Sequence, residues 1–395
     1  FFKQKTAYEM LRSLVGSEMC IRDRTAIKEA ENETQLIHQI TEWFLRDLIS
    51  RTFGLQYLDN FIARVYQVLG EQKERLDHKE LDLMLSYDPN QILCTIHSPK
   101  EQTKNLIHLG NKGFNLVLLA QEGVQVPPGV IVTTEVFRCY PIIRKLPSVY
   151  REFRSQLQKA IGELEHQTGR RFGDSSNPLL LSVRSGAAIS MPGMMSTIIN
   201  VGSNLEIIEG LAKKTGNVWF AWDNYRRFVQ SWAMAFDLDR EMFTELISNH
   251  KRRYGVKQKR EFTGDQMKEL ALAYHQATLD HGLELEVEPF EQLLVAIRLI
   301  LTSWESEKAK NYREIMEMSD YWGTAVILQA MAYGNLAETS GTGVAFTPIH
   351  TDHIDNIGLW GDFTTGNQGD DIVSGLVTTY PISIKQEKTL GLDSE

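Results

Sequence analysis

The stretch Leu179-Leu180-Leu181-Ser182-Val183-Arg184-Ser185-Gly186 decides how this chain is interpreted. Residues 179–183 predict a short buried strand, from the length of the apolar run and its flanking residues. Arg184 follows directly, and a planar guanidinium suits phosphate because it donates two hydrogen bonds at once. An arginine at a strand end is more commonly a structural ion-pair residue, so both interpretations of Arg184 stay open.

A methionine-rich segment, Met191-Pro192-Gly193-Met194-Met195, comes soon after this strand. Methionines of this kind often fill a core, because their side chains adapt to irregular gaps. The sharper alternative is a flexible loop that closes over a ligand. Gly193 would then allow the backbone to approach that ligand closely.

Upstream, Gly110-Asn111-Lys112-Gly113 predicts a tight turn just before a helix that begins near Phe114. Such a turn aims backbone N–H groups and one ammonium at the same point, an arrangement that suits an anion. The spacing of the P-loop motif is absent. Taken alone, the segment is more typical of a glycine turn with a solvated lysine.

Helical patterns dominate residues 203–320, and after Trp322 the chain changes to apolar runs and glycines. Strands are expected over 324–331, 341–346, 359–363 and 372–377, and a broken strand is expected over 124–134. Long helices with a late glycine-rich β region predict an α+β fold. Gln329-Ala330-Met331 and Ser340-Gly341-Thr342-Gly343 are each compatible with plain turns. Together they could form an adenine slot beside a phosphate-contacting edge.

The composition argues against several classes of protein. The formal net charge of −9 over 395 residues makes nucleic acid a poor partner. No apolar run approaches the roughly 20 residues of a membrane-spanning helix. Three separated cysteines without a secretory signal favour free thiols in the cytoplasm, and the histidines show no metal-ligand spacing.

The N-terminal part carries no motif with evident chemistry. Residues 1–24 resemble a translated sequencing-adapter segment and are expected to be non-native. Residues 25–97 are expected to form a small helical region, because apolar residues recur there at helical spacing as far as residue 70. The remaining region, 98–395, is the expected nucleotide-binding domain.

These segments occur in one order that resembles the nucleotide-binding portion of the pyruvate, phosphate dikinase family, nearly continuously from Leu109 to Ser374. The most specific resemblances are six blocks of sequence: Gly173 to Ala187, Ser190 to Met195, Glu209 to Asn217, Tyr225 to Phe228, Gly323 to Val326, and Glu338 to Thr347. The resemblance implies an ATP-grasp-like fold with two α+β lobes, incomplete at its C-terminal end.

The same resemblance implies roles for individual residues. Lys112 and Arg184 match the catalytic contacts to the ATP phosphates, and Gly193 lies in the mobile loop above them. Gln329, Ala330 and Met331 face the adenine, and the remaining nucleotide contacts fall on Ser340, Gly341, Thr342 and Gly343. Asp362, where the family has Glu, is the candidate contact to Mg²⁺.

The resemblance also implies an activity and its partners. In the family, ATP pyrophosphorylates a histidine on a swivelling domain, orthophosphate removes the terminal phosphoryl group, and the phosphohistidine converts pyruvate to phosphoenolpyruvate. The phosphohistidine and pyruvate-binding domains have no counterpart in this sequence, and a homodimer of the full-length protein is compatible with it. Two other functions stay open: a non-catalytic ATP sensor, and a water-using dikinase like phosphoenolpyruvate synthase.

Several departures from the family bear on these expectations. Pro348 and Val377 stand where the family has arginines. The acidic D-x-E element that holds magnesium, the L-Q-x-R strand after it and the T-S-H motif of the acceptor histidine have no match in the sequence. The 395 residues are therefore not expected to turn over alone.

Overall fold

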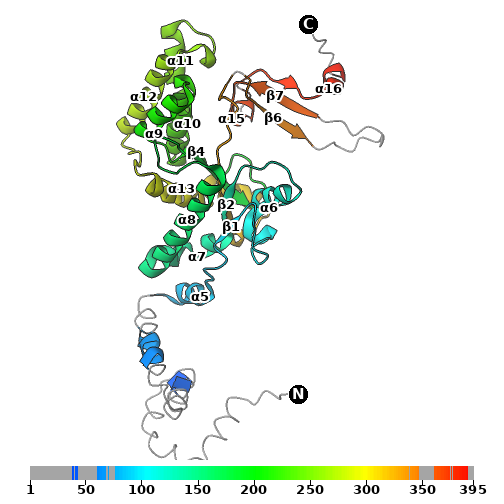
Figure 1. The fold of residues 1–395 in the computed structure, drawn as a ribbon. Helices are drawn as coiled ribbons and strands as arrows, with labels where there is room; N and C mark the ends of the chain where they lie inside the picture. Colours follow the sequence, from blue (N-terminus) through cyan, green and yellow to red (C-terminus); the bar gives the residue numbers. More distant parts are fainter. Residues whose placement is uncertain are drawn as a thin grey trace, which may run out of the picture. The chain divides into compact units, whose positions relative to one another are not determined.

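The computed structural model (Figure 1) describes residues 38–39, 41–42, 60–67, 70, 76–337, 339–346, 360–373, 375 and 377–389. Its contacts separate the chain into two units, Phe1–Asp82 and Leu83–Glu395. In the first unit the described residues 60–67 are helical. The adapter-like segment 1–24 and Pro348 lie outside the described residues.

The second unit contains a five-stranded antiparallel sheet in the order β1-β2-β5-β3-β4. Every residue of the central strand β5 is buried. Helices and antiparallel sheets occur together, which confirms the predicted α+β class. The first strand precedes residue 98, where the nucleotide-binding domain was expected to start. The strands are β1 (Leu93–Thr95), β2 (Gly129–Val132), β3 (Leu181–Ala187), β4 (Thr197–Val201) and β5 (Thr324–Ala330).

Strand β3 is longer than its apolar run predicts. The expected strand ended at Val183, with Arg184 at its tip; instead β3 pairs with β5 from Leu181 through to Ala187. The ladder continues through Gly186 and Ala187, which pair with Ala325 and Thr324, and the Gly186 N–H also donates to the Thr324 hydroxyl at 3.2 Å. Arg184 therefore lies in the middle of the strand, exposed, and opposite Ile327 and Thr197.

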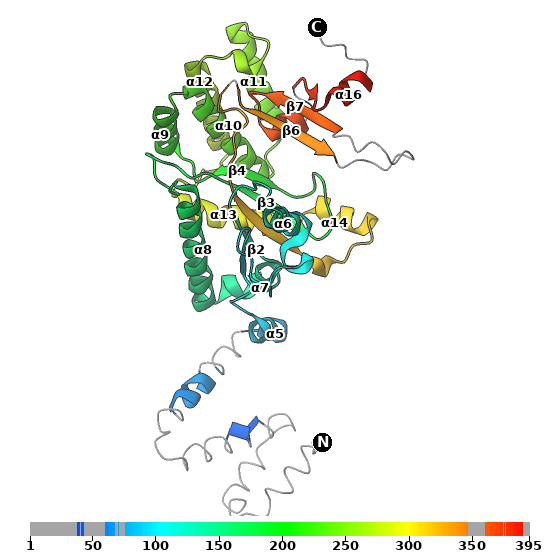
Figure 2. The same cartoon turned by 45° about the vertical axis from the view of Figure 1, so that its right-hand side comes forward.

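Helices surround this sheet (Figures 1 and 2). Helix α6 packs on it through an apolar cluster that includes Leu109, Val117, Ile131 and Ile327. Within the described residues, no helix is long and apolar enough to cross a membrane. The helices of this part are α6 (Leu106–Gln121), α7 (Thr134–Lys145), α8 (Pro147–Thr168), α13 (Pro289–Ser303), α14 (Glu307–Ile315) and the 3₁₀ helix η3 (Asp320–Trp322). Helix α5 (His78–Ser86) spans the boundary between the two units.

A helical group lies beside β4 and is built around α10 (Val218–Ala235), which contacts α9, α12 and β4. Most of α10 is buried, including the charged residues Asp223, Arg226 and Arg227. Charged side chains at such positions need partners within the protein. The other members are α9 (Leu205–Thr215), α11 (Arg240–Tyr254), the 3₁₀ helix η2 (Lys259–Glu261) and α12 (Gly264–Asp280).

A second, three-stranded sheet comprises β6 (Gly341–Phe346), β7 (Trp360–Thr365) and β8 (Tyr380–Pro381). The helices α15 (Gly369–Val373) and α16 (Ile384–Thr389) accompany it. The predicted strand over 372–377 is wrong, since α15 occupies its first residues. That short helix is favoured because the Asp371 carboxylate accepts the backbone N–H of Gln368, 3.1 Å away.

Candidate functional site

A backbone contact between α6 and β3 creates the first part of the site. Gly110 interrupts α6 with φ 65° and ψ 171°. A Cβ on Gly110 would lie 1.7 Å from the carbonyl oxygen of Gly186 on β3, so any side chain there would clash with backbone. The helix was expected to begin near Phe114, but it starts at Leu106 and continues beyond this break.

This contact brings Lys112 close to Arg184. Both side chains are exposed to solvent. Partial desolvation, and then the neighbouring Arg184 charge, hold the pKa of the Lys112 amine below its ordinary value. The positive charges of Lys112 and Arg184 repel each other, and a bound anion would relieve that repulsion.

The expected adenine segment lies at the end of β5. Gln329 and Ala330 are buried, and the Gln329 side-chain amide donates to the carbonyl oxygen of Pro127 at 3.0 Å. The backbone N–H of Met331 donates to the Leu180 carbonyl oxygen at 3.0 Å. The Gln329 amide group is thus engaged within the protein, and Met331 is the partly exposed member of the three.

The expected phosphate-contacting segment lies at the start of β6, the edge strand of the second sheet. Gly341 and Gly343 are exposed, opposite Thr365 and Phe363 of β7. Thr342 is partly buried, and its hydroxyl donates to the carbonyl oxygen of Asn367 at 2.9 Å. An edge strand has a row of backbone donors and acceptors that its sheet does not use.

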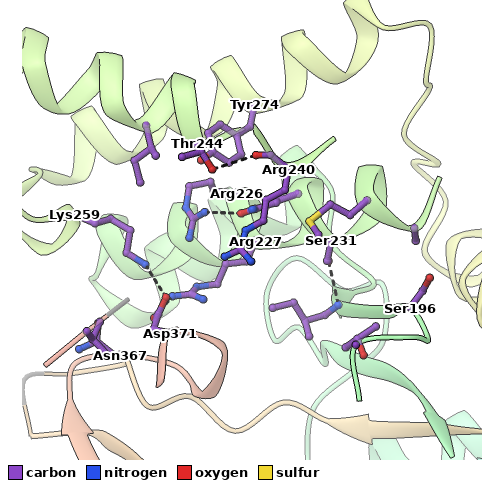
Figure 3. Close-up of a pocket in the computed structure, with 18 of the residues that line it drawn as sticks. Ser196, Arg226, Arg227, Ser231, Arg240, Thr244, Lys259, Tyr274, Asn367 and Asp371 are labelled. Atoms are coloured by element: carbon purple, nitrogen blue, oxygen red, sulfur yellow. Dashed lines mark hydrogen bonds and ion pairs between the residues drawn. The ribbon is translucent and has the colours of Figure 1, made fainter. Parts of the chain in front are cut away.

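Gly193 lies on a separate feature, a cavity of about 1240 Å³ (Figure 3). It has a φ of 71°, and a Cβ there would meet no atom within 4 Å. Thr197, the β4 residue opposite Arg184, also lines the cavity. The residues lining the cavity do not include Lys112, Arg184, the adenine segment or the β6 segment. Thr197 and Thr365, which pair with Arg184 and with Gly341, nevertheless line the same cavity as Gly193.

The cavity is strongly basic although the whole chain carries a net charge of −9. Its acidic side chains are Asp237, Glu305 and Asp371. Such an excess of cations around a hollow raises the local concentration of anions. The basic side chains that line it are Arg226, Arg227, Arg240, Lys251, Lys257, Lys259, Arg260 and Lys308.

Part of this positive charge is paired with buried carboxylates, as Figure 3 shows for Arg227, Lys259 and Asp371. Asp223 is fully buried and pairs with Arg226 at 2.8 Å, Arg227 at 2.9 Å and Lys259 at 3.3 Å. Arg227 also reaches Asp371 at 2.5 Å. We call this group of Asp223, Arg226, Arg227, Lys259 and Asp371 the ion cluster.

Within the cluster, the pKa values of Asp223 and Lys259 are both lowered, but for different reasons. Burial alone would raise the pKa of Asp223, but Arg227, Lys259 and Arg226 together hold it well below its ordinary value. Desolvation by burial lowers the pKa of Lys259 to about 8, even though Asp223 and Asp371 oppose that change. Desolvation thus brings the titration of Lys259 closer to neutral pH than that of a solvated lysine.

The sequence had indicated these residues incompletely. Arg226 and Arg227 were noted only within the resemblance block Tyr225–Phe228. Their spacing from Asp223, three and four residues along one helix, was a usable signal because side chains so spaced are neighbours. No sequence signal links Lys259 or Asp371 to Asp223, since 36 residues separate Lys259 from Asp223.

Asp362, the candidate magnesium contact, lies on β7 opposite Val344 of β6 and Pro381 of β8. Within the part of the chain that the structure describes, no group of three or more His, Cys, Asp or Glu side chains could hold a metal ion. Asp362 is therefore not part of such a group among the described residues.

A comparison with protein families shows to which family the chain belongs. The family model described as "Pyruvate phosphate dikinase, AMP/ATP-binding domain" matches residues 143–394. The chain belongs to this family. The resemblance read from the sequence is thereby confirmed, and Arg184, Gly193 and the β6 segment lie within the matched residues, whereas Lys112 lies ahead of them.

Curated relatives agree with the family. Pyruvate, phosphate dikinase of Clostridium symbiosum is 41% identical over 280 residues, which are 70% of this chain and 31% of that protein. The Giardia intestinalis protein is 38% identical over 284 residues, 71% of this chain and 32% of the relative. Chloroplastic pyruvate, phosphate dikinase 1 of Arabidopsis thaliana is 40% identical over 273 residues, which are 68% of this chain and 28% of that protein. The chain thus spans about a third of the length of these relatives.

Proposed function

We propose that this chain is the ATP-binding part of a dikinase-type phosphotransferase and has an ATP-grasp-like fold. The observation that carries the proposal is the contact of Gly110 with Gly186, which places Lys112 beside Arg184 in a member of this family. A pyrophosphoryl group would pass to a histidine on a separate domain, orthophosphate would accept its terminal phosphoryl group, and the remaining phosphoryl group would pass to pyruvate, forming phosphoenolpyruvate. Domains for those steps would lie in parts of the relatives that this chain does not span.

The proposed site binds and orients the triphosphate through fixed positive charge. Lys112 and Arg184 contact phosphate oxygens, and exposed backbone N–H groups of β6 near Gly341 and Gly343 contribute further donors. Met331 and its neighbours on β5 face the adenine. Phosphoryl transfer spreads negative charge over oxygens in the transition state, so donors already in place stabilise it without reorganising.

The proposed site also accommodates Mg²⁺, with Asp362 as one ligand. Magnesium prefers oxygen ligands and is usually held by one or two carboxylates together with substrate phosphates. A single carboxylate near the nucleotide fits that pattern, which explains why a complete protein cage is not required. When bound, Mg²⁺ would neutralise charge on the phosphates.

Substitution of Lys112 or Arg184 tests the proposal. Lys112→Ala and Arg184→Ala in the full chain should each weaken ATP binding about 10- to 100-fold by calorimetry, as expected for the loss of a charged hydrogen bond. Lys159→Ala and Arg151→Ala serve as matched controls, because both residues are exposed on α8. Equal affinities for all four variants would reject the assignment.

A further inference from the structure

The start of β6 is packed into the turn that follows β7. The hydroxyl of Thr342 donates to the Asn367 carbonyl oxygen at 2.9 Å, and the N–H of Gly366 donates to the Ser340 carbonyl oxygen at 2.8 Å. A Cβ on Gly334 would lie 1.9 Å from the Thr342 hydroxyl and 2.3 Å from the Asn367 carbonyl oxygen. These three segments are therefore packed closely against one another.

Two buried amide side chains join this packed turn to helix α10. The Gln368 side-chain amide donates to the side-chain oxygens of Asn224 at 2.7 Å and Asn335 at 2.9 Å. Asn335 in turn donates to the carboxylate of Asp223 at 3.2 Å. Gln368 is 5% exposed and Asn335 4%, so water cannot readily replace the lost partners if either amide is removed.

The connection ends on the ion cluster. Asp371 accepts the backbone N–H of Gln368 at 3.1 Å and pairs with Arg227 of α10 at 2.5 Å. Asp223, at the other end, is held by Arg226, Arg227 and Lys259. Hydrogen bonds thus run from Asp223 of α10 through Asn335 to Gln368, whose chain neighbour Asn367 accepts the hydroxyl of Thr342.

We propose that Gln368 and Asn335 are positioning residues for the nucleotide, because they fix the start of β6 relative to α10 and to the end of β5. The inference rests on the proposed function in one respect, namely that the β6 segment contacts ATP. Asn335 follows Met331 closely in the chain, so the same two amides also set the separation between the adenine segment and the phosphate segment. Neither side chain needs to touch the nucleotide for this role.

The test compares two buried glutamines of the same region. Gln368→Leu removes the two hydrogen bonds that the Gln368 amide donates, to Asn224 and to Asn335. Gln386→Leu is the matched control, because Gln386 is 2% exposed and accepts the N–H of Gly361 at 2.9 Å at the other end of β7. Both variants lose a buried amide, so general destabilisation should affect them alike.

Two readouts are taken in the full chain, well below the unfolding temperature of each variant. Amide hydrogen exchange without nucleotide measures the order of β6, residues 341–346, and calorimetry measures the dissociation constant for ATP. Gln368→Leu should speed exchange across β6 by at least about tenfold and weaken ATP binding by a similar factor. Gln386→Leu should leave the ATP affinity within about twofold.

Each other outcome has a defined meaning. Unchanged β6 exchange in Gln368→Leu overturns the positioning role, whatever ATP does. Faster exchange with unchanged ATP affinity overturns it too, since the position of β6 would then not matter to the nucleotide. If β6 exchanges faster in Gln368→Leu but the wild-type protein binds no ATP, the hydrogen-bonded connection is supported and the proposed function is rejected.

A second pair of variants covers the case in which Gln368→Leu does not fold. Gln368→Asn keeps the amide and shortens it by one methylene, and Asn335→Ser removes the next link. If the two residues form one connection, the double variant should weaken ATP binding by about as much as the stronger single variant. If the double variant instead loses ATP affinity by the product of the two single-variant factors, the two residues act independently and the proposal is overturned.

Discussion

Two regions of this protein gather positive charge, and they handle it differently. Lys112 and Arg184 are exposed and close together, so their charges repel and are accessible to a ligand. In the ion cluster, Arg226, Arg227 and Lys259 are largely buried around Asp223 and Asp371. Charge of the same sign is therefore exposed in one region, where we propose that it binds the phosphates, and is paired with buried carboxylates in the other.

The variant expected to change the free energy of unfolding most, and so to test this distinction most strongly, replaces Asp223. Asp223→Ala should destabilise the protein by about 3–5 kcal/mol, because it leaves buried cations without their carboxylate. Arg184→Ala should change stability by less than about 0.5 kcal/mol, as an exposed residue. Thermal and urea unfolding measure both; similar losses for the two variants would contradict the distinction.

The close contact of Gly110 with Gly186 provides the second test of the distinction between the two regions. Gly110→Ala should cost about 1–3 kcal/mol more than Gly169→Ala, since both glycines have φ above 60° but only Gly110 would meet backbone. Gly110→Ala should also weaken ATP binding, because α6 must move away from β3. The expectation fails if urea unfolding and calorimetry give the same values for both alanine variants.

The smallest effect concerns the pH dependence contributed by Lys259. Its pKa is about 8 in the folded protein, below the 10.5 of a solvated lysine, so between these values the unfolded chain binds more protons. Stability should therefore rise with pH across this window, by at most about 1.4 kcal/mol per pH unit. The charged groups facing the amine are Asp223, Arg226, Arg227 and Asp371.

Lys259→Met provides the control for this pH dependence. The difference in unfolding free energy between wild type and Lys259→Met isolates the lysine from other groups that titrate in the same range. That difference should change steadily between pH 8 and pH 10.5, in favour of the wild type. A difference that stays constant across the window would mean that Lys259 titrates as a solvated amine.

The two regions also differ in how much the sequence could predict. The turn at Gly110 and the strand at Leu181 were visible because glycine spacing and apolar runs are local signals. The extension of β3 beyond Arg184 depends on pairing with β5, more than a hundred residues away in the chain, and was missed. Strand β6 was predicted with its observed bounds, since glycines and small residues mark it.

The ion cluster shows why the rest was beyond sequence reasoning. Arg227 and Asp371 are 144 residues apart, and neither position carries a pattern that points to the other. The mainly apolar composition of residues 372–377 predicted a strand. The local hydrogen bond between Gln368 and Asp371 instead favours the short helix α15. Buried charge pairs of this kind are fixed by tertiary packing, which a local pattern cannot contain.

The most direct test of the central claim is an NMR titration of the Lys112 amine with and without ATP. In the ATP-free protein its pKa should lie below that of a solvated lysine and should rise when Arg184 is replaced by Gln. Saturation with ATP should raise the wild-type pKa, because phosphate oxygens stabilise the ammonium. A pKa that is unchanged by bound ATP and by Arg184→Gln would contradict the claim that Lys112 and Arg184 converge on one triphosphate.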